Sequence, residues 1–156
     1  MAYVMMTPPP QLSRYYTLKL AFLYPDGTSP FMNRVVAWAS RNPVCHIELV
    51  FENDMAFSIF EGSELFFKQR TFSNPEYRIV ALSVSKEEYT SAYTFCENAV
   101  TKGFAFSDWA MWGTYFQIPG YPFVCPSTPE QSGSTCCSKI VTEAMLFARK
   151  IGRAHV

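Results

Sequence analysis

The segment that decides the fold is GSTCCSKIVTEAM, residues 133–145. Ser134 and Thr135 are common N-cap residues, and the apolar residues that follow recur at the 3.6-residue period of a helix. The pattern predicts a helix from Thr135 to about Lys150 whose first turn carries two thiols. The apolar stripe centres within about 10° of Cys137, so we expect this cysteine to face the packed side of the helix.

The position of Cys137 is one at which a cysteine nucleophile can be made. The positive end of the helix macrodipole and the unpaired backbone N–H groups stabilise a thiolate over a thiol and can hold an oxyanion. Cysteine is also a small residue that is often simply buried, which is the alternative explanation. Cys136 lies about 110° away around the helix and is expected to be a spectator. His46, upstream in the chain, favours the catalytic interpretation.

Length and charge limit the class of protein. A chain of 156 residues can bury a core of its own, and we expect one domain over residues 1–150 and a tail over residues 151–156. Lys plus Arg and Asp plus Glu both number 13, so the balance favours neither nucleic acid nor an anionic membrane. Because no segment approaches the length of an apolar membrane span, no integral membrane segment is expected. The oligomeric state is not indicated.

Five cysteines are an odd number, and they lack the paired spacing of a zinc site or of a secreted disulfide framework. We therefore expect a reducing, cytoplasmic location, in the host cytoplasm if the protein is viral, and neither a metal nor a cofactor. Aromatic residues make up 17% of the chain, which fits either an aromatic core or a groove for a hydrophobic ligand.

The order of the predicted elements is that of an α+β fold. Apolar alternation predicts strands over residues 15–24, 44–51, 56–61, 65–70 and 77–82. Helices are predicted over residues 31–40, with an apolar face of Phe31, Val35 and Trp38; over about 85–101, between a capping box and Gly103; and over 106–115. Residues 117–132 contain four prolines and are predicted to be a loop. The fold class is thus a mainly antiparallel sheet packed against helices.

His46 is the internal candidate for a general base. A thiol needs a neighbouring imidazole to lose its proton, and the imidazole needs a third polar group to fix its tautomer. We expect Glu61, near the end of the returning hairpin strand, to be that group. Glu48 competes for the role because it lies two residues from His46 on the same face of the strand. The alternatives are a structural role for His46 and a solvated strand end at Glu61.

Three segments together resemble a known family. The segment RNPVCHIELV, residues 41–50, is similar to the "short helix, small-polar-Pro, then His on a strand" motif of the circularly permuted NlpC-type papain-like thiol hydrolases. The segment AFSIFEG, residues 56–62, looks like the family's next strand, which ends in a glutamate. The segment TCCSKIV, residues 135–141, resembles its nucleophile motif. Three positions depart from the pattern: Glu48, Cys136 and Lys139.

The resemblance implies a permuted papain-like domain in which Cys137 is the nucleophile, His46 the base and Glu61 its polar partner. It implies a cysteine-dependent peptidase or amidase that cleaves an amide or ester bond through a thioacyl intermediate. Because relatives include lipid acyltransferases and esterases of the lecithin:retinol acyltransferase-like group, the substrate is expected to be peptide-like or an acyl ester. Glu48, Trp109 and Trp112 are the candidate substrate-binding residues.

Two interpretations without catalysis stay open. One is a binding module that keeps the pocket of this scaffold and has lost turnover. The other is a structural protein, for example of a virus, in which Trp109 and Trp112 belong to an assembly surface and the thiol is incidental.

Overall fold

The structure, a computed structural model, describes residues 15–39, 41–106 and 134–154. The helices are α1 (Phe31–Ala39), α2 (Lys86–Lys102) and α5 (Cys137–Ala154). The strands are β1 (Tyr16–Leu23), β2 (His46–Val50), β3 (Met55–Ser58), β4 (Phe66–Gln69), β5 (Tyr77–Val84), β6 (Ala105–Phe106) and β7 (Ser134–Thr135). The described part of the chain forms one small α+β domain.

The first five strands form one antiparallel sheet in the order β4-β3-β2-β1-β5. β1 lies between β2 and β5 and pairs with β5 along its whole length. The paired residues of β2 and β3 are Leu49 with Phe57 and Val50 with Ala56. Nearer to His46 a side chain links the two strands: the Ser58 hydroxyl donates to the Ile47 carbonyl at 2.6 Å. The predicted antiparallel sheet is confirmed.

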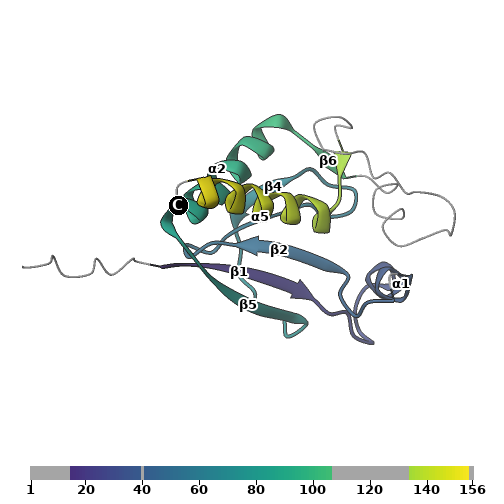
Figure 1. Cartoon of the computed structure of the whole chain (residues 1–156). Helices are drawn as coiled ribbons and strands as arrows, with labels where there is room; N and C mark the ends of the chain where they lie inside the picture. The colour runs from purple at the N-terminus through teal and green to yellow at the C-terminus, as the bar shows by residue number, and fades with distance from the viewer. Residues whose placement is uncertain (1–14, 40, 107–133, 155–156) are drawn as a thin grey trace, which may run out of the picture.

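α2 and α5 lie side by side on one face of this sheet (Figure 1). α2 begins with the predicted capping box, in which the Ser85 hydroxyl accepts from the Glu88 N–H and the Glu88 carboxylate accepts from the Ser85 N–H. It ends at Gly103, whose φ of 70° belongs to the left-handed region that glycine adopts at low cost. Both ends of this helix are therefore fixed by local chemistry.

Strand alternation places apolar residues on both faces of the sheet. Leu49 of β2 and Phe51, the residue after this strand, join the main core under the helices, together with Cys137 and Ile140 of α5. Val50 faces the other way, into a smaller cluster of Ala21 and Ala56 packed by Phe66, Phe72 and Tyr77. Because successive side chains of a strand alternate, His46 and Glu48 lie on the same face as Val50.

α1 has the predicted bounds within one residue but a different packing face. The predicted apolar face is exposed, with Phe31 at 69% and Trp38 at 80%, whereas Val36 is buried at 5%. Phe31, Val35 and Trp38 line a shallow hollow on this helix together with Arg34. Helical periodicity identifies an apolar stripe but not the element that covers it, and here the buried position is Val36.

The last helix begins two residues later than predicted. Ser134 and Thr135 form β7, which pairs in parallel with β6, so the expectation that they cap the helix is wrong. The physical reason is strand pairing with a segment about 30 positions earlier, and capping preferences depend only on neighbouring residues. The predicted loop over residues 117–132 lies outside the described residues, as does the predicted helix over 106–115 apart from its first residue.

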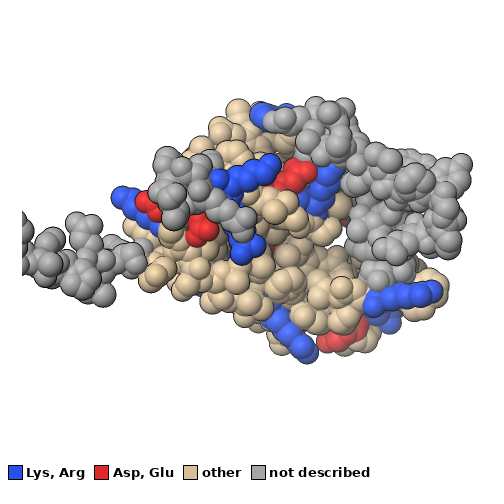
Figure 2. Space-filling model, in the orientation of Figure 1, with Lys and Arg blue, Asp and Glu red and all other residues tan. Residues whose placement is uncertain are grey.

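Charged side chains of both signs are interspersed on the face shown in Figure 2. This distribution agrees with the equal numbers of acidic and basic residues in the chain. Within residues 15–39, 41–106 and 134–154 there is no helix with the length and hydropathy needed to cross a bilayer.

Candidate functional site

The candidate nucleophile, Cys137, is the first residue of α5. The Cys136 carbonyl accepts the first helical hydrogen bond, from the Ile140 N–H at 3.0 Å, so Cys136 occupies the N-cap position. The Cys137 side chain is 9% exposed and belongs to the main core. The expectation that Cys137 faces the packed side of the helix is therefore confirmed.

The Cys137 sulfur lies beside the start of β2. It accepts a hydrogen bond from the backbone N–H of Ile47, which belongs to the peptide group that joins His46 to Ile47. Its charge also contributes to raising the pKa of Cys45 to about 12, an effect that needs a short separation, although burial of Cys45 is the larger cause. The thiol therefore lies against the backbone at the start of β2, on the face of Leu49, whereas the His46 side chain lies on the opposite face of the sheet with Glu48 and Val50.

Burial decides the protonation of the Cys137 thiol. Desolvation raises its pKa to about 11 from 9.0, and the charge of Cys136 adds to the rise. The N–H groups of Ile47, Ser138 and Cys137 itself act in the opposite direction. The donors expected at a helix N-terminus are present, but desolvation outweighs them, so the thiol is protonated at neutral pH.

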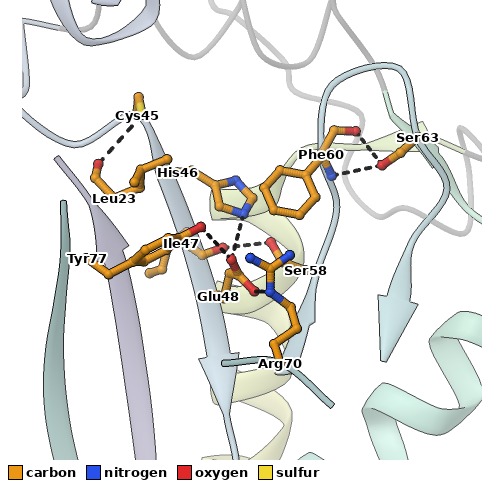
Figure 3. A network of polar contacts seen from close by, with 10 residues as sticks. All are labelled: Leu23, Cys45, His46, Ile47, Glu48, Ser58, Phe60, Ser63, Arg70 and Tyr77. Atoms are coloured by element: carbon orange, nitrogen blue, oxygen red, sulfur yellow. Dashed lines mark hydrogen bonds and ion pairs between the residues drawn. The ribbon is translucent and has the colours of Figure 1, made fainter. Parts of the chain in front are cut away.

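The imidazole of His46 is held on one side by an aromatic ring and at one edge by a carboxylate (Figure 3). It is 7% exposed and stacks on Phe60, with ring centroids 4.3 Å apart and an interplanar angle of 18°. Its Nε2 lies 3.6 Å from Oε1 of Glu48. This separation is longer than a direct hydrogen bond.

Glu48 is fully buried and has a cation and a hydroxyl beside it. The Nε of Arg70 lies 3.1 Å from Oε2, and the Tyr77 hydroxyl donates to Oε1 at 2.9 Å. Burial raises the pKa of Tyr77, and the Glu48 charge adds to this rise, so the phenol stays protonated as the donor. One positive charge therefore balances the buried negative charge next to His46.

Glu61, the predicted orienting residue, lies in the turn that follows β3 and is exposed. β3 ends at Ser58, three residues earlier than the predicted strand, and Gly62 has a φ of 70° that turns the chain. In the part of the chain that the structure describes, the carboxylate paired with His46 is that of Glu48. The predicted pairing of Glu61 with His46 stays a prediction.

The remaining predicted site residues are Glu48, Trp109 and Trp112. Glu48 was expected to bind substrate, yet it is enclosed by protein groups at 0% exposure. Trp109 and Trp112 lie outside the described residues, as does the proline-rich loop expected to border the groove. Across the described ranges, no three His, Cys, Asp or Glu side chains gather in a way that would hold a metal ion.

Sequence reasoning missed Arg70, Tyr77 and Phe60. A signal was present, because a glutamate between Ile47 and Leu49 in an otherwise apolar strand must be buried with a partner or must lie at the surface. The partner itself was not identifiable, since Arg70 and Tyr77 are 22 and 29 positions from Glu48 and reach it only through the pairing of the sheet.

Comparison with known proteins adds no assignment. No protein-family model, no curated protein and no solved structure matches this chain.

Proposed function

We propose that this protein is a cysteine-dependent acyl hydrolase or acyltransferase with a permuted papain-like arrangement of its site. The observation that carries the proposal is the place of Cys137 at the start of α5, where the backbone N–H groups of Ile47 and Ser138 act to lower the thiol pKa. Glu48, beside Nε2 of His46, takes the orienting role in this proposal. The resemblance to NlpC-type thiol hydrolases supports the same assignment.

In the proposed reaction the Cys137 sulfur attacks the carbonyl carbon of an amide or ester while the thiol proton passes to His46. The tetrahedral oxyanion accepts hydrogen bonds from backbone N–H groups at the start of α5. Collapse of this intermediate breaks the bond to the leaving group, which takes the proton from the imidazolium. The resulting thioester is then cleaved by water in a hydrolase or by an acceptor alcohol or amine in a transferase.

The protonation of the thiol favours a base that acts during attack over a preformed ion pair. A thiol with a pKa of about 11 is almost entirely protonated at neutral pH, so little thiolate is present before substrate arrives. We propose peptide-like or acyl-ester substrates because the relatives that the resemblance brings in act on both.

One observation favours a second candidate, a binding module that retains the scaffold without turnover. The Cys137 side chain is only 9% exposed, and a nucleophile must be reached by its substrate. This candidate predicts that ligand retention is unaffected by Cys137→Ser and that no acyl adduct forms.

The test is covalent capture of the nucleophile. Purified wild type is incubated with a panel of p-nitrophenyl acyl esters and activated peptide esters, and the acyl adduct is located by intact and fragment mass spectrometry. We expect an adduct on Cys137 whose rate of formation at pH 7 falls by roughly 10²- to 10⁴-fold in His46→Gln, the usual contribution of a general base.

Cys45→Ala is the matched control, because it removes a neighbouring thiol and leaves the proposed machinery intact. We expect it to acylate at the wild-type rate. An acylation rate of Cys137 that is the same with and without His46 would falsify the catalytic proposal. Ligand retention without any adduct would favour the binding module instead.

A further inference from the structure

β5 is an edge strand of the five-stranded sheet (Figure 1). It is eight residues long and, among the described strands, pairs with β1 alone, in an unbroken one-to-one register. An edge strand presents a row of backbone N–H and C=O groups that its own sheet does not use, and this row is a template for pairing with another strand. β5 therefore needs either protection or a partner along its outer edge.

β5 has none of the features that usually protect an edge strand. Its sequence, YRIVALSV, contains no proline, its register with β1 contains no bulge, and Arg78 is its single charged residue. The Cζ atom of Arg78 lies 4.3 Å from the ring centroid of Tyr24, the residue after β1. This contact holds the guanidinium on the β1 side of the strand, so the outer edge has no charge of its own.

The opposite edge of the sheet is protected. β4 has only four residues, its exposed half contains Lys68, and Arg70 follows it directly. A short strand with basic side chains disfavours pairing with a further strand. The two edges of the sheet thus differ in length and in charge, which are the properties that decide edge-to-edge association.

One hydrogen bond identifies the backbone groups of β5 that point outward. The Tyr24 N–H donates to the Glu76 carbonyl at 2.9 Å, so position 76 faces β1. Because alternate residues of an antiparallel strand bond to the same neighbour, the even-numbered residues of β5 face β1 and the odd-numbered residues face the open edge. The outward-facing residues are Tyr77, Ile79, Ala81 and Ser83.

The middle of β5 is apolar and exposed on both faces of the sheet. Ile79 lies opposite Ala21, which belongs to the smaller apolar cluster. Val80 lies opposite Leu20, which packs against the core under the helices. Ile79 and Val80 are each 48% exposed. Neither layer of the domain therefore covers the centre of this strand.

We propose that β5 is a homodimer interface, in which β5 of one copy pairs antiparallel with β5 of a second copy and joins the two sheets into one. Two identical antiparallel strands are related by a two-fold axis, so the same surface serves both copies. A second copy suits this edge because the chain has 13 basic and 13 acidic residues, and two copies therefore have no net charge with which to repel each other. The uncharged outer edge gives no preference for a charged partner.

The register follows from the exposed side chains. With the two-fold axis at Val80, this residue lies opposite Val80 of the second copy, and Ile79 lies opposite Ala81 as an outward-facing, hydrogen-bonded pair. Both half-exposed apolar residues are then central, where β-branched cross-strand pairs stabilise a sheet. Arg78 lies opposite Leu82, so the two arginines of the dimer do not face each other.

The test is sedimentation equilibrium of the full chain with a reductant present. We expect a reversible dimer with a Kd on the order of 10 μM, as for a small interface. Val80→Lys places two ammonium groups opposite each other at the two-fold axis and is expected to raise the Kd at least about tenfold. Gln69→Lys is the matched control, because it adds the same charge at an exposed position of β4, and its Kd is expected to stay within about twofold of wild type.

Ala81→Pro tests the backbone pairing directly. It removes an outward-facing N–H, whereas the hydrogen bonds with β1 belong to the even-numbered residues and are kept. We expect the dimer to be lost while the far-UV circular dichroism stays that of wild type. If this variant does not fold, Val80→Lys and amide exchange decide the question.

Amide exchange measured by NMR reports which backbone groups pair. In Val80→Lys we expect the even-numbered amides of β5 to be protected by β1, whereas the amides of Ile79 and Ala81 exchange freely. In wild type at about 300 μM, where most chains are dimeric, the exchange of these two amides is expected to slow by roughly fivefold to tenfold.

Three outcomes overturn the inference. Wild type that sediments as a monomer at about 300 μM does so, and so does a dimer whose Kd is the same in wild type and in Val80→Lys. A dimer that is abolished by Trp38→Ser but not by Val80→Lys assigns the interface to the exposed face of α1 instead. None of these measurements involves the reactivity of Cys137, so the dimer and the proposed function are tested separately.

Discussion

The buried thiol of Cys137 predicts a loss of stability at alkaline pH. In the folded protein burial raises the thiol pKa to about 11, whereas the unfolded chain has the ordinary value of 9.0. Between these pH values the unfolded chain releases the thiol proton and the folded chain keeps it, so rising pH favours the unfolded state. The stabilisation is complete below pH 9 and is lost as the pH rises through 11.

The size of this effect follows from the difference of two pKa units. At 1.36 kcal/mol per unit, the thiol of Cys137 accounts for about 2 to 3 kcal/mol of the free energy of unfolding between neutral pH and pH 11. Solvent screening reduces this free energy only slightly, because Cys137 is 9% exposed. Cys45 and Cys96, whose pKa values are also raised, add to the slope in every variant and cancel in a difference.

The measurement is urea unfolding of wild type and Cys137→Ala, with a reductant present and ionic strength constant, at intervals from pH 7 to 10.5. We expect the difference in unfolding free energy between the two proteins to be constant to about pH 9 and then to decrease by about 1.4 kcal/mol per pH unit. Ile140→Val, a non-titrating change at another buried position of α5, gives a constant difference. The reasoning is refuted if the Cys137→Ala difference is equally constant to pH 10.5.

Three other predictions concern the carboxylates, the helix ends and α1. Glu48→Gln leaves Arg70 without its partner and is expected to lower the free energy of unfolding by about 3 to 5 kcal/mol, whereas exposed Glu61→Gln changes it by less than about 0.5 kcal/mol in the same urea titration. If Glu61→Gln instead slows Cys137 labelling more than Glu48→Gln does, Glu61 is the orienting residue. Ser85→Ala is expected to cost about 1 kcal/mol through loss of the capping box on α2, measured as a lower thermal midpoint that Ser85→Asp largely restores; equal midpoints for all three proteins would contradict the capping role. Trp38→Ser, at an 80% exposed position, is expected to change stability by less than about 0.5 kcal/mol, against 2 to 5 kcal/mol for Leu49→Ala in the core; a large loss with Trp38→Ser would mean that α1 packs on more than the described contacts.

Local chemistry was sufficient to predict the regular elements. The alternation of Leu18, Leu20 and Phe22 identified β1, and the Ser85 capping box and Gly103 fixed both ends of α2. These signals depend on residues within a few positions of one another, so the sequence contains them in full. The five-stranded antiparallel sheet followed from the order of the elements.

The errors arose where a distant segment changes a local preference. Ser134 and Thr135 are good N-cap residues, but pairing of β7 with β6 extends them and moves the start of α5 to Cys137. Trp38 completes a helical stripe, yet it is 80% exposed and the buried residue of α1 is Val36. The spacing of residues within each segment contains no information about the pairing of β7 with β6 or about which residue of α1 is buried.

In the candidate site, too, local positions were predictable from the sequence and contacts between distant segments were not. The roles expected of Cys137 and His46 came from their positions on a helix start and a strand; the structure places the thiol against the backbone at the start of β2 and the imidazole on the other face of that strand. The sequence ranked Glu61 ahead of Glu48 as the orienting residue, because neighbours on one face of a strand rarely form a direct hydrogen bond with each other. In the structure Nε2 of His46 lies 3.6 Å from Oε1 of Glu48 with no hydrogen bond between them, which agrees with that argument, yet Glu48 is the carboxylate beside the ring.

The electrostatics of the site lead to one further step in the mechanism. In the proposed mechanism a thiol whose pKa is raised to about 11 is protonated before substrate arrives, so no resting thiolate is expected. The N–H groups at the start of α5 are then of most use after attack, when negative charge has moved from the sulfur to the carbonyl oxygen. On this argument the helix N-terminus stabilises the oxyanion more than the nucleophile, and proton transfer to His46 accompanies formation of the carbon–sulfur bond. A solvent deuterium isotope effect on acylation of Cys137 that disappears in His46→Gln is the expected signature, and its absence from wild type would return the mechanism to a preformed thiolate.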